Sequence, residues 1–511
     1  MSVFSKNTFQ KVKPEAFNTS NKKAILDKEG ARSLITLVTS SHNVIEAFCI
    51  WLSKYSDLKT KKNKRLCLRV ELSKMISLLD EILSEAISNI LHHEDFQALE
   101  SAWTGLFYLA VQKHQKDIEG RIKIKVIDLS WAELSKDVHK AIEFDQSEFF
   151  KMIYSQEFDM PGGEPYGVII ANYQLSHTPR KNIPYNDLDT LKLISQTAAA
   201  SFSPFIASVK PSLLGLNDFT DLGRPINISE HFMQSDFVKW RSLRSSDDVR
   251  YIGLTLPEIL MRRPYRQYYF NNKNKFQFSE LIRHPKDDYL WGNAAFAFGS
   301  VLIRAFTNHG WFAQIRGATR GQFDGGIVES LPFEYLKVSR NIREITASVN
   351  VKIGDKTEHE LSHNGFISLC HLKNSSHHVF YSNNSIQEPR DYNKQIANVN
   401  ARISSMLQYI LSASRFAHYL KIICRNRVGR FDSSNECQLY LQNWLHEYTT
   451  ASDSDSIDLK ARYPLKEASV SVEDVPGRPG MYSCIAHLQP HFQMDQMVSS
   501  LKLVTELPAK A

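Results

Sequence analysis

The chain has 511 residues, which is enough for two or more domains with sizeable hydrophobic cores. Hydrophobic residues make up 42% of it and charged residues 23%, which excludes a chain that is disordered throughout. The formal net charge of +7 is small for this length, so it permits nucleic acid or another acidic partner without requiring one.

The cysteines and the N-terminus indicate a cytoplasmic protein. The six cysteines are scattered and form no CxxC pair, as expected for thiols in a reducing compartment. The N-terminal MSVFSKNTFQKVKPEAF lacks the apolar run of a secretory signal. The most apolar stretch, residues 289–306, is interrupted by Arg304 and is shorter than the roughly 20 apolar residues of a spanning helix. We therefore expect it to form a buried core helix, without membrane insertion.

Residues 1–65 are expected to form a variable N-terminal extension. They are polar and uneven, apart from one apolar patch at 33–55, and they end in the basic run KTKKNKR at 59–65. A charge run of this kind favours a solvated linker over a contact with nucleic acid.

A domain spanning residues 66–380 is predicted to begin with an amphipathic helix. Apolar residues between 66 and 91 recur every three or four positions, which is the helical spacing. The following HHED has side chains of metal-ligand type, but adjacent residues on a helix point in different directions and do not easily share one ion. We therefore interpret HHED as a helix junction.

The middle of the chain mixes helix and strand patterns. RIKIKVIDLS at 121–130 alternates like a half-buried strand, and PGGEPYGVIIANYQL at 161–175 is typical of a turn that leads into a strand. Helical patterns lie between such strands without a regular βαβ period. This favours an α+β fold, or an irregular α/β fold, over a doubly wound sheet.

A second domain is predicted for residues 385–508, after a polar, turn-rich boundary at 374–390. It begins with a long helix over 391–429, with a kink expected near Ser412–Ser414 because of its length. A second helix and three strand-like runs follow, so this domain is a helix-plus-sheet unit. The last run, 498–507, contains Leu501 and Leu503 and is a candidate edge strand that another chain completes.

One segment matches a catalytic motif. HELSH, with His359, Glu360 and His363, is an HExxH pattern, which on a helix can bind zinc and supply a general base. The upstream SVNVKIGD alternates like a strand, and the downstream Asn364-Gly365 is a strong turn signal, which leaves room for at most about two helical turns. The glycine and the next histidine also fail the spacing of the extended HExxHxxGxxH form.

Two interpretations of this segment remain open at this point. One is a zinc hydrolase built on these three residues, and the other is a polar turn ahead of the strand FISLCHL. No nucleophile elbow, phosphate-binding loop, zinc knuckle or dinucleotide fingerprint occurs elsewhere in the sequence. A nucleic-acid-binding protein that uses the Lys/Arg clusters is a further alternative.

A basic stripe is predicted on the long C-terminal helix. Its members share one helix face, being three, three and four residues apart: Arg415, His418, Lys421 and Arg425. Such a stripe is either a solvated face or an electrostatic contact with an acidic partner surface that sets orientation and register.

In their order, these segments resemble the large subunit of the contractile sheath of bacterial type VI secretion systems, the TssC/VipB/EvpB family. The resemblance runs from about residue 66 to 508. Its clearest stretches are HHEDFQALESAWTGLFYL, FDQSEFFKMIYSQEFDMPGGEPYG, WRSLRSSDDVRYIGLTLPEILMRRPY, YLWGNAAFAFGSVLIRAFTNHGWFAQIRG, ELSHNGFISL, SRFAHYLKIICRNRVG and LQPHFQMDQMVSSLKLV.

The resemblance implies a non-enzymatic building block with a phage-baseplate-like C-terminal domain and no cofactor. Family members pair with a small sheath subunit, TssB or VipA, and stack helically around a tube of Hcp protein in the cytoplasm. The assembly is attached through a baseplate to an envelope complex. Neighbouring protomers exchange strands, and the ATPase ClpV recycles contracted sheath. The weak match of residues 1–65 leaves ClpV recognition open for this chain, and the family pattern ELS…GF does not require His359 or His363.

Overall fold

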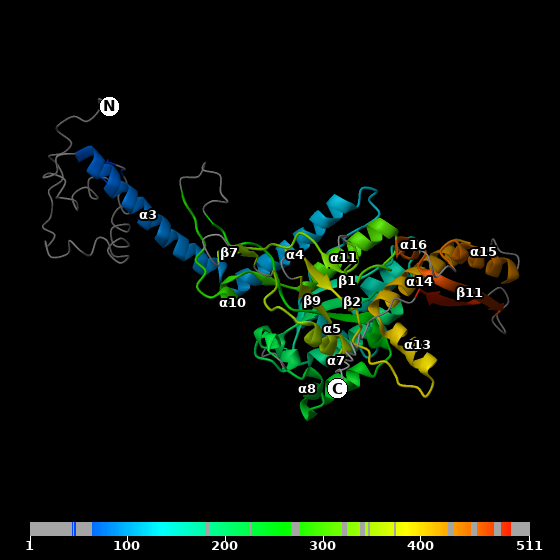
Figure 1. Ribbon diagram of the computed structural model, residues 1–511. Helices are drawn as coiled ribbons and strands as arrows, with labels where there is room; N and C mark the ends of the chain where they lie inside the picture. Colours follow the sequence, from blue (N-terminus) through cyan, green and yellow to red (C-terminus); the bar gives the residue numbers. More distant parts are fainter. Residues whose placement is uncertain are drawn as a thin grey trace, which may run out of the picture. The chain divides into compact units, whose positions relative to one another are not determined.

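The computed structural model comprises two compact units (Figure 1), residues 1–97 with 264–289 and residues 98–263 with 290–511. The residues that the structure describes are 43, 45–46, 64–178, 183–224, 226–266, 276–318, 324–337, 343–345, 348–372, 375–427, 434–450, 457–474 and 482–491. Within these ranges, no helix combines the length and the apolar character needed to cross a membrane.

The first unit is built on α3 (Lys64–Leu91), followed by the beginning of α4 (Glu94–Lys116) and by α10 (Pro285–Asp288). The predicted helix and the junction at His92-His93 are both confirmed. The buried hydroxyl oxygens of Ser84 and Ser88 accept hydrogen bonds from the backbone N–H groups of Ser279 and Leu281, at 3.4 and 3.1 Å. These bonds attach the segment 276–289 to one face of α3.

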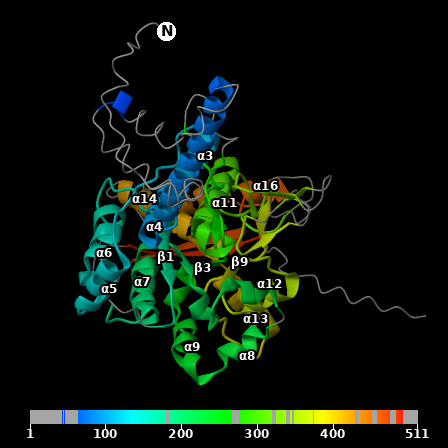
Figure 2. The same cartoon turned by 90° about the vertical axis from the view of Figure 1, so that its left-hand side faces the viewer.

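The second unit contains a six-stranded sheet in the order β1-β2-β3-β9-β10-β6. Figure 2 labels three of its strands, β1, β3 and β9. The first four of these strands pair in parallel, and β10 and β6 continue the sheet in antiparallel pairing. The strands are β1 (Ile169–Leu175), β2 (Phe205–Val209), β3 (Ile252–Leu256), β9 (Phe366–His371), β10 (His378–Phe380) and β6 (Ile327–Val328).

Helices cover both faces of this sheet. On one face, residues such as Phe205 and Leu254 pack with α5 (Trp131–Lys140), α7 (Asp187–Ser201), α9 (Val238–Arg244) and α12 (Asp355–His363). On the other face, Ile206 and Ile367 pack with α11 (Ala294–His309) and with Leu109 of α4. Because side chains alternate along a strand, strands with two covered faces are apolar on both sides.

A third core lies in the C-terminal part of the second unit. It joins α14 (Leu407–Asn426) and α15 (Ser434–His446) to the hairpin of β11 (Leu465–Asp474) and β12 (Tyr482–Pro490). The rings of Trp311 and Phe416 stack with their centroids 4.0 Å apart. This contact holds α14 against the segment that follows α11.

The remaining elements are short or irregular. They are α6 (Glu148–Phe150), the π-helix η5 (Lys151–Phe158), α8 (Ile228–Phe232), β4 (Ile259–Leu260), β5 (Trp291–Gly292), β7 (Tyr335–Lys337), β8 (Arg343–Ile345), α13 (Gln395–Ser405), α16 (Ile457–Arg462) and the 3-10 turns η4 (Phe144–Gln146), η6 (Pro211–Leu214), η7 (Phe219–Gly223), η8 (Ser235–Phe237) and η9 (Asp248–Tyr251).

The α+β prediction is confirmed, and so are the buried helix within 289–306 and the strand after the turn at 161–175. The sequence did not reveal that four neighbouring strands are parallel. The domain boundaries at 65–66 and 380–385 stay predictions. Of the N-terminal extension 1–65, only residues 43, 45–46 and 64–65 are described. The run 498–507 lies outside the described residues.

Two local strand predictions were wrong. Residues 121–130 are not part of a sheet among the described residues, and Val126 is exposed rather than half-buried. Among the described residues, SVNVKIGD forms a single bridge, between Val349 and Ile259. The segment 374–390, near which the second domain boundary is predicted, contains β10, which pairs with β9.

The predicted helix over 391–429 is two helices, and its break lies at Met406 rather than near Ser412–Ser414. Met406 has extended backbone angles (φ −80°, ψ 126°) and forms a bridge with Asn384, and the next N–H, of Leu407, donates to the carbonyl oxygen of Asn383 at 2.9 Å. These bonds take the place of helical bonds, so tertiary pairing decides where the helix breaks.

Candidate assembly surfaces

The HELSH segment forms the last five residues of α12, a nine-residue helix, so the interpretation of this segment as a polar turn was wrong. His359 and His363 are exposed at the surface, and the helix ends at His363. The side chain of Glu360 is directed towards the amino end of α8. Its Oε2 accepts the backbone N–H of Ile228, the first residue of that helix, at 3.0 Å. Within the described ranges, no group of three or more His, Cys, Asp or Glu side chains is arranged to hold a metal ion.

The residues around the histidines have structural roles. Leu361 is fully buried, and Glu358 is buried beside Ser382, whose hydroxyl donates to its carboxylate. Burial raises the pKa of Glu358, with the Ser382 hydrogen bond opposing that shift. The side-chain amide of Asn364 donates to the carbonyl oxygen of Glu360 at 2.8 Å and so closes the end of α12.

Gly365 is needed where α12 turns into β9. Its φ of +85° lies in the left-handed region, and a Cβ built on it would lie 2.9 Å from the Cα of Ile386 and 3.0 Å from the carbonyl oxygen of Ser385. The next residue, Phe366, is fully buried and stacks on Trp240, with ring centroids 5.2 Å apart. The ELS…GF pattern is therefore accounted for by helix capping and packing.

The basic stripe on α14 makes its contacts within this chain. The Nζ of Lys421 lies 3.0 Å from Oδ1 of Asp159 and 3.6 Å from the centre of the Phe158 ring. Nη1 of Arg425 donates to the carbonyl oxygen of Met160 at 2.8 Å. Both cations therefore meet the carboxyl end of η5, where the exposed carbonyl groups and the helix dipole favour positive charge.

Arg415, at the other end of the stripe, contacts aromatic rings. Its Nη2 donates to the hydroxyl of Tyr419 at 3.2 Å, and its guanidinium lies over the rings of Tyr419 and Phe306 at 4.7 and 5.8 Å. A docking role of Arg415, Lys421 and Arg425 towards another chain stays a prediction, and any such contact would compete with these internal ones.

His418 does not belong to an exposed stripe, and this part of the prediction was wrong. Its side chain is 1% exposed, and its Nε2 lies 2.9 Å from the carbonyl oxygen of Ser201. Since a carbonyl only accepts, Nε2 carries the proton, and the buried Nδ1 has no hydrogen-bond partner among the residues that the structure describes. The rings of Phe158 and Phe202 stand edge-on to it.

Burial lowers the pKa of His418 to about 4, and nearby Arg415 and Lys421 add to the shift while the Ser201 carbonyl opposes it. Because the pKa in the folded state lies below the ordinary value of 6.5, the unfolded chain binds the proton more readily. The stability that the neutral ring contributes is therefore complete above pH 6.5 and is lost as the pH falls from there towards 4.

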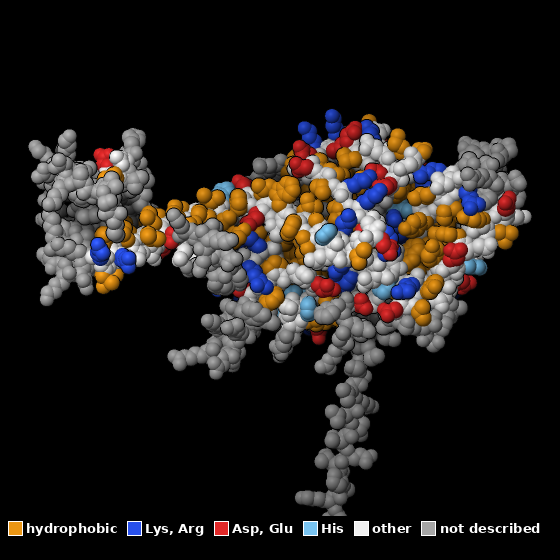
Figure 3. Space-filling view, turned by 90° about the horizontal axis from the view of Figure 1, so that it is seen from above, with side chains coloured by type: hydrophobic (Ala, Val, Ile, Leu, Met, Phe, Trp, Pro, Cys, Tyr) orange, Lys and Arg blue, Asp and Glu red, His pale blue; other side chains and the backbone are white. Residues whose placement is uncertain are grey.

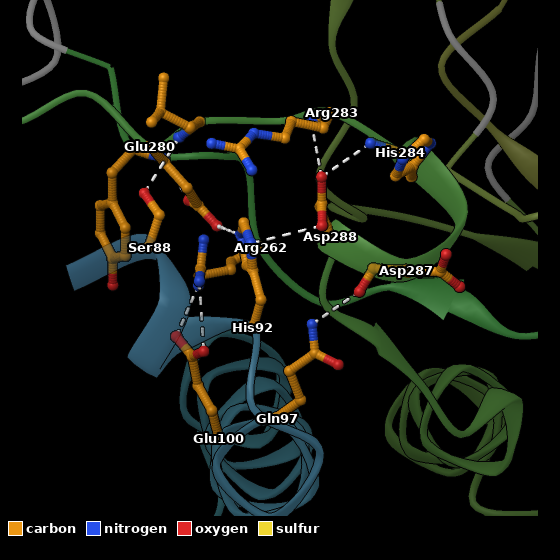
Figure 4. Close-up of polar contacts among 12 residues, drawn as sticks. Ser88, His92, Gln97, Glu100, Arg262, Glu280, Arg283, His284, Asp287 and Asp288 are labelled. Carbon is orange, nitrogen blue, oxygen red and sulfur yellow. Dashed lines mark hydrogen bonds and ion pairs between the residues drawn. The ribbon is translucent and has the colours of Figure 1, made fainter. Parts of the chain in front are cut away.

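The other candidate residues have different outcomes. Leu501 and Leu503 lie outside the described residues, so their part in strand exchange stays a prediction. His92 of the HHED junction lies 3.0 Å from Oε1 of Glu280 and 3.4 Å from Oδ1 of Asp288 (Figure 4). These contacts hold the segment 276–289 against the end of α3.

Sequence reasoning missed the partners of the stripe. Phe158, Asp159 and Met160 immediately precede the Pro161-Gly162-Gly163 turn, which was recognised only as a lead into β1. An aromatic residue and an acidic residue directly ahead of this turn were the available signal, because aromatic rings and carboxylates attract cations.

Comparisons with known proteins show the family of this chain. Residues 73–387 match the family model described as EvpB/VC_A0108, tail sheath N-terminal domain, and residues 396–507 match the tail sheath gpW/gp25-like domain of the same group. The chain belongs to the VipB/EvpB tail sheath family. A curated relative, the type VI secretion system sheath protein TssC1 of Pseudomonas aeruginosa, is 35% identical over 439 residues, which is 85% of each chain.

Solved structures similar to this VipB/EvpB chain are more distant. One is the cryo-EM structure of the anti-feeding prophage baseplate, with 9% identity, a TM-score of 0.35 and coverage of 76% of this chain and 84% of that one. Another is an extracellular contractile injection system, the PVC sheath complex in its contracted state, with 8% identity, a TM-score of 0.35 and coverage of 62% and 68%. At these TM-scores, the assignment rests on the family models and the curated relative.

The substitution Gly365→Ala tests the structural account of the HELSH region. We expect it to lower the free energy of unfolding by about 2 kcal/mol, because alanine disfavours the left-handed conformation and its Cβ meets the backbone of Ile386. His363→Ala, at an exposed position in the same segment, is the matched control and should unfold like the parent. Thermal unfolding of both variants measures this, and equal midpoints would contradict the account.

A charge reversal tests whether Lys421 of the stripe stabilises its own chain. Lys421→Glu should destabilise the protein by about 1 kcal/mol, because it loses the contact with the Phe158 ring and faces Asp159 with like charge. The double variant Lys421→Glu/Asp159→Lys restores opposite charges and should recover part of the loss in chemical unfolding. If the double variant is no more stable than the single one, the internal pair does not contribute.

Proposed function

We propose that this chain is the large structural subunit of the contractile sheath of a type VI secretion system. The observation that carries the proposal is the match of both sheath models, in order, to residues 73–387 and 396–507. The 35% identity to a type VI secretion sheath protein over 85% of both chains supports a type VI secretion system as the assembly to which this sheath belongs.

The sheath wall is built from heterodimers of this chain and a small TssB/VipA-like subunit. They stack helically around an inner tube of Hcp, and strands exchanged between neighbours, including 498–507, connect them. A baseplate attaches the tubule to an envelope complex, and the whole assembly lies in the cytoplasm. A ClpV-like ATPase recycles the contracted form. The family resemblance supports each of these partners.

The chain moves as a rigid block when the sheath contracts. Its second unit has a sheet with helices on both faces and a third core fixed by the Trp311–Phe416 stack, which supports rigidity. The free energy released on contraction is stored in contacts between protomers, which repack between two discrete arrangements. Interior packing changes little, because packed cores are not continuously deformable.

The work of this subunit is mechanical and needs no catalysis or cofactor. Glu360, the general base of the zinc-hydrolase alternative, is engaged with the amino end of α8, which supports this proposal. Elemental analysis of the purified protein separates the two: stoichiometric zinc that is lost in His359→Ala would overturn the proposal in favour of a zinc hydrolase.

Co-expression with the small sheath subunit tests assembly. We expect hollow tubules in negative-stain electron microscopy when both chains are present, and none from either chain alone. Truncation before residue 396, which removes the second matched domain, should abolish tubules. Soluble monomers from the co-expressed full-length chains would contradict the proposal.

A further inference from the structure

The segment 122–128, between α4 and α5, exposes apolar side chains without belonging to a helix or a strand. Ile124, Val126 and Ile127 are 37%, 65% and 46% exposed. Single apolar side chains also reach the surface elsewhere, between charged ones (Figure 3), so exposure alone does not identify a binding site. The backbone distinguishes this segment: among the described residues, no N–H or C=O group of 123–128 forms a hydrogen bond.

The side-chain contacts of the segment alternate as in an extended chain. Lys123 pairs with Glu164, and Lys125, two residues later, pairs with Glu157. The two carboxylates belong to one site, because Oε2 of Glu157 also accepts the N–H of Glu164 at 3.0 Å. Side chains two residues apart point to the same side of an extended chain. The even-numbered side chains of the segment are therefore directed away from both carboxylates.

Both ends of the segment are fixed. At its start, the carboxylate of Asp117 accepts the N–H groups of Arg121 and Ile122, at 3.0 and 2.7 Å. At its end, the hydroxyl of Tyr173 donates to the carbonyl oxygen of Leu129 at 2.5 Å. A segment that is held in place before binding loses little conformational entropy when a partner adds to it.

We propose that residues 122–128 receive an extended segment of the small sheath subunit, which adds to them as a strand. This inference rests on the proposed function as a sheath subunit. A strand presents N–H and C=O groups along its edges, which match the backbone groups of 123–128, whereas a helix uses its own groups internally. The β-branched side chains at 124, 126 and 127 also favour a paired strand.

A second copy of this chain is a poorer occupant. Antiparallel pairing of two copies over the whole of 122–128 brings Lys125 opposite Lys125 of the other copy. Parallel pairing in register brings both Lys123 and Lys125 beside the same residues of the other copy. Like charges at such positions are destabilising, so the occupant is a different chain. In the proposed sheath, the small subunit is the different chain that forms a heterodimer with this one. The site is separate in sequence from 498–507, where strand exchange is proposed.

Hydrogen exchange with residue resolution tests the proposal, on the full-length chain alone and in its complex with the co-expressed small subunit. In the chain alone, the amides of 123–128 should exchange within about tenfold of an unstructured peptide, because they form no hydrogen bonds within the described part of the chain. In the complex, every second amide should slow by at least about tenfold, because successive N–H groups of a strand point to opposite edges.

Val126→Pro and Ile127→Pro form a matched pair of variants. Each replaces an exposed β-branched residue and removes one N–H, and the two N–H groups face opposite edges of an extended chain. Only one of the two should weaken binding of the small subunit by at least about tenfold, and the other should stay within about threefold, because proline is tolerated at the unpaired edge of a strand. Thermal unfolding of each variant alone checks that its fold is retained.

Three results would contradict the inference. Unchanged exchange of 123–128 in the complex means that no strand adds there. Equal weakening of binding by both proline variants indicates side-chain packing, and protection that rises with the concentration of the chain alone assigns the site to a second copy. Tubules that form while 123–128 exchange fast overturn this inference and leave the sheath function intact, whereas the absence of both complex and tubules overturns both.

Discussion

The fold of the second unit depends on one constraint: its sheet is buried on both faces. Four parallel strands cannot be joined by hairpins, so the chain must leave the sheet after each strand and return to it. The returning segments supply the covering helices, α7 and α9 on one face and α11 on the other. After α12 ends at His363, Gly365 turns the chain into β9, which enters the sheet beside β3.

The same constraint explains how much of the fold the sequence predicted. Helices with a clear apolar pattern, such as α3 and the core helix α11, were found because local spacing determines them. The pairing of β3 with β9 joins residues more than a hundred positions apart, and no local pattern contains that information. The break at Met406 depends on a bridge to Asn384, so the length of the predicted helix alone placed the kink in the wrong position.

The candidate site shows a similar division. The turn signal Asn364-Gly365 correctly argued against a long zinc-binding helix. The role of Glu360 follows only from the tertiary structure, in which its carboxylate accepts the N–H of Ile228. For the α14 stripe, charge spacing identified the face, whereas only tertiary structure shows that His418 is buried and that Lys421 meets Asp159. A helix packed on several sides has no single polar face, so spacing overestimates how much of it is exposed.

In this sheath subunit, some contacts stabilise the chain itself, and other surfaces remain exposed to neighbouring subunits. The α14 stripe and the ELS…GF segment stabilise the interior of the second unit. Apolar surface remains elsewhere, including Trp103 and Phe107, which are strongly exposed on the face of α4 opposite Leu109. Large exposed aromatic residues are the kind of surface that assemblies bury.

The central claim is that this chain is a rigid building block of a sheath wall. Cryo-EM reconstructions of co-assembled tubules in the extended and contracted states test it most directly. The account predicts that the six-stranded sheet, its two helical layers and the contact of α14 with the end of η5 fit both maps as one unchanged body. A wall in which β9 separates from β3 between the two states, or whose density does not accommodate this sheet, would contradict it.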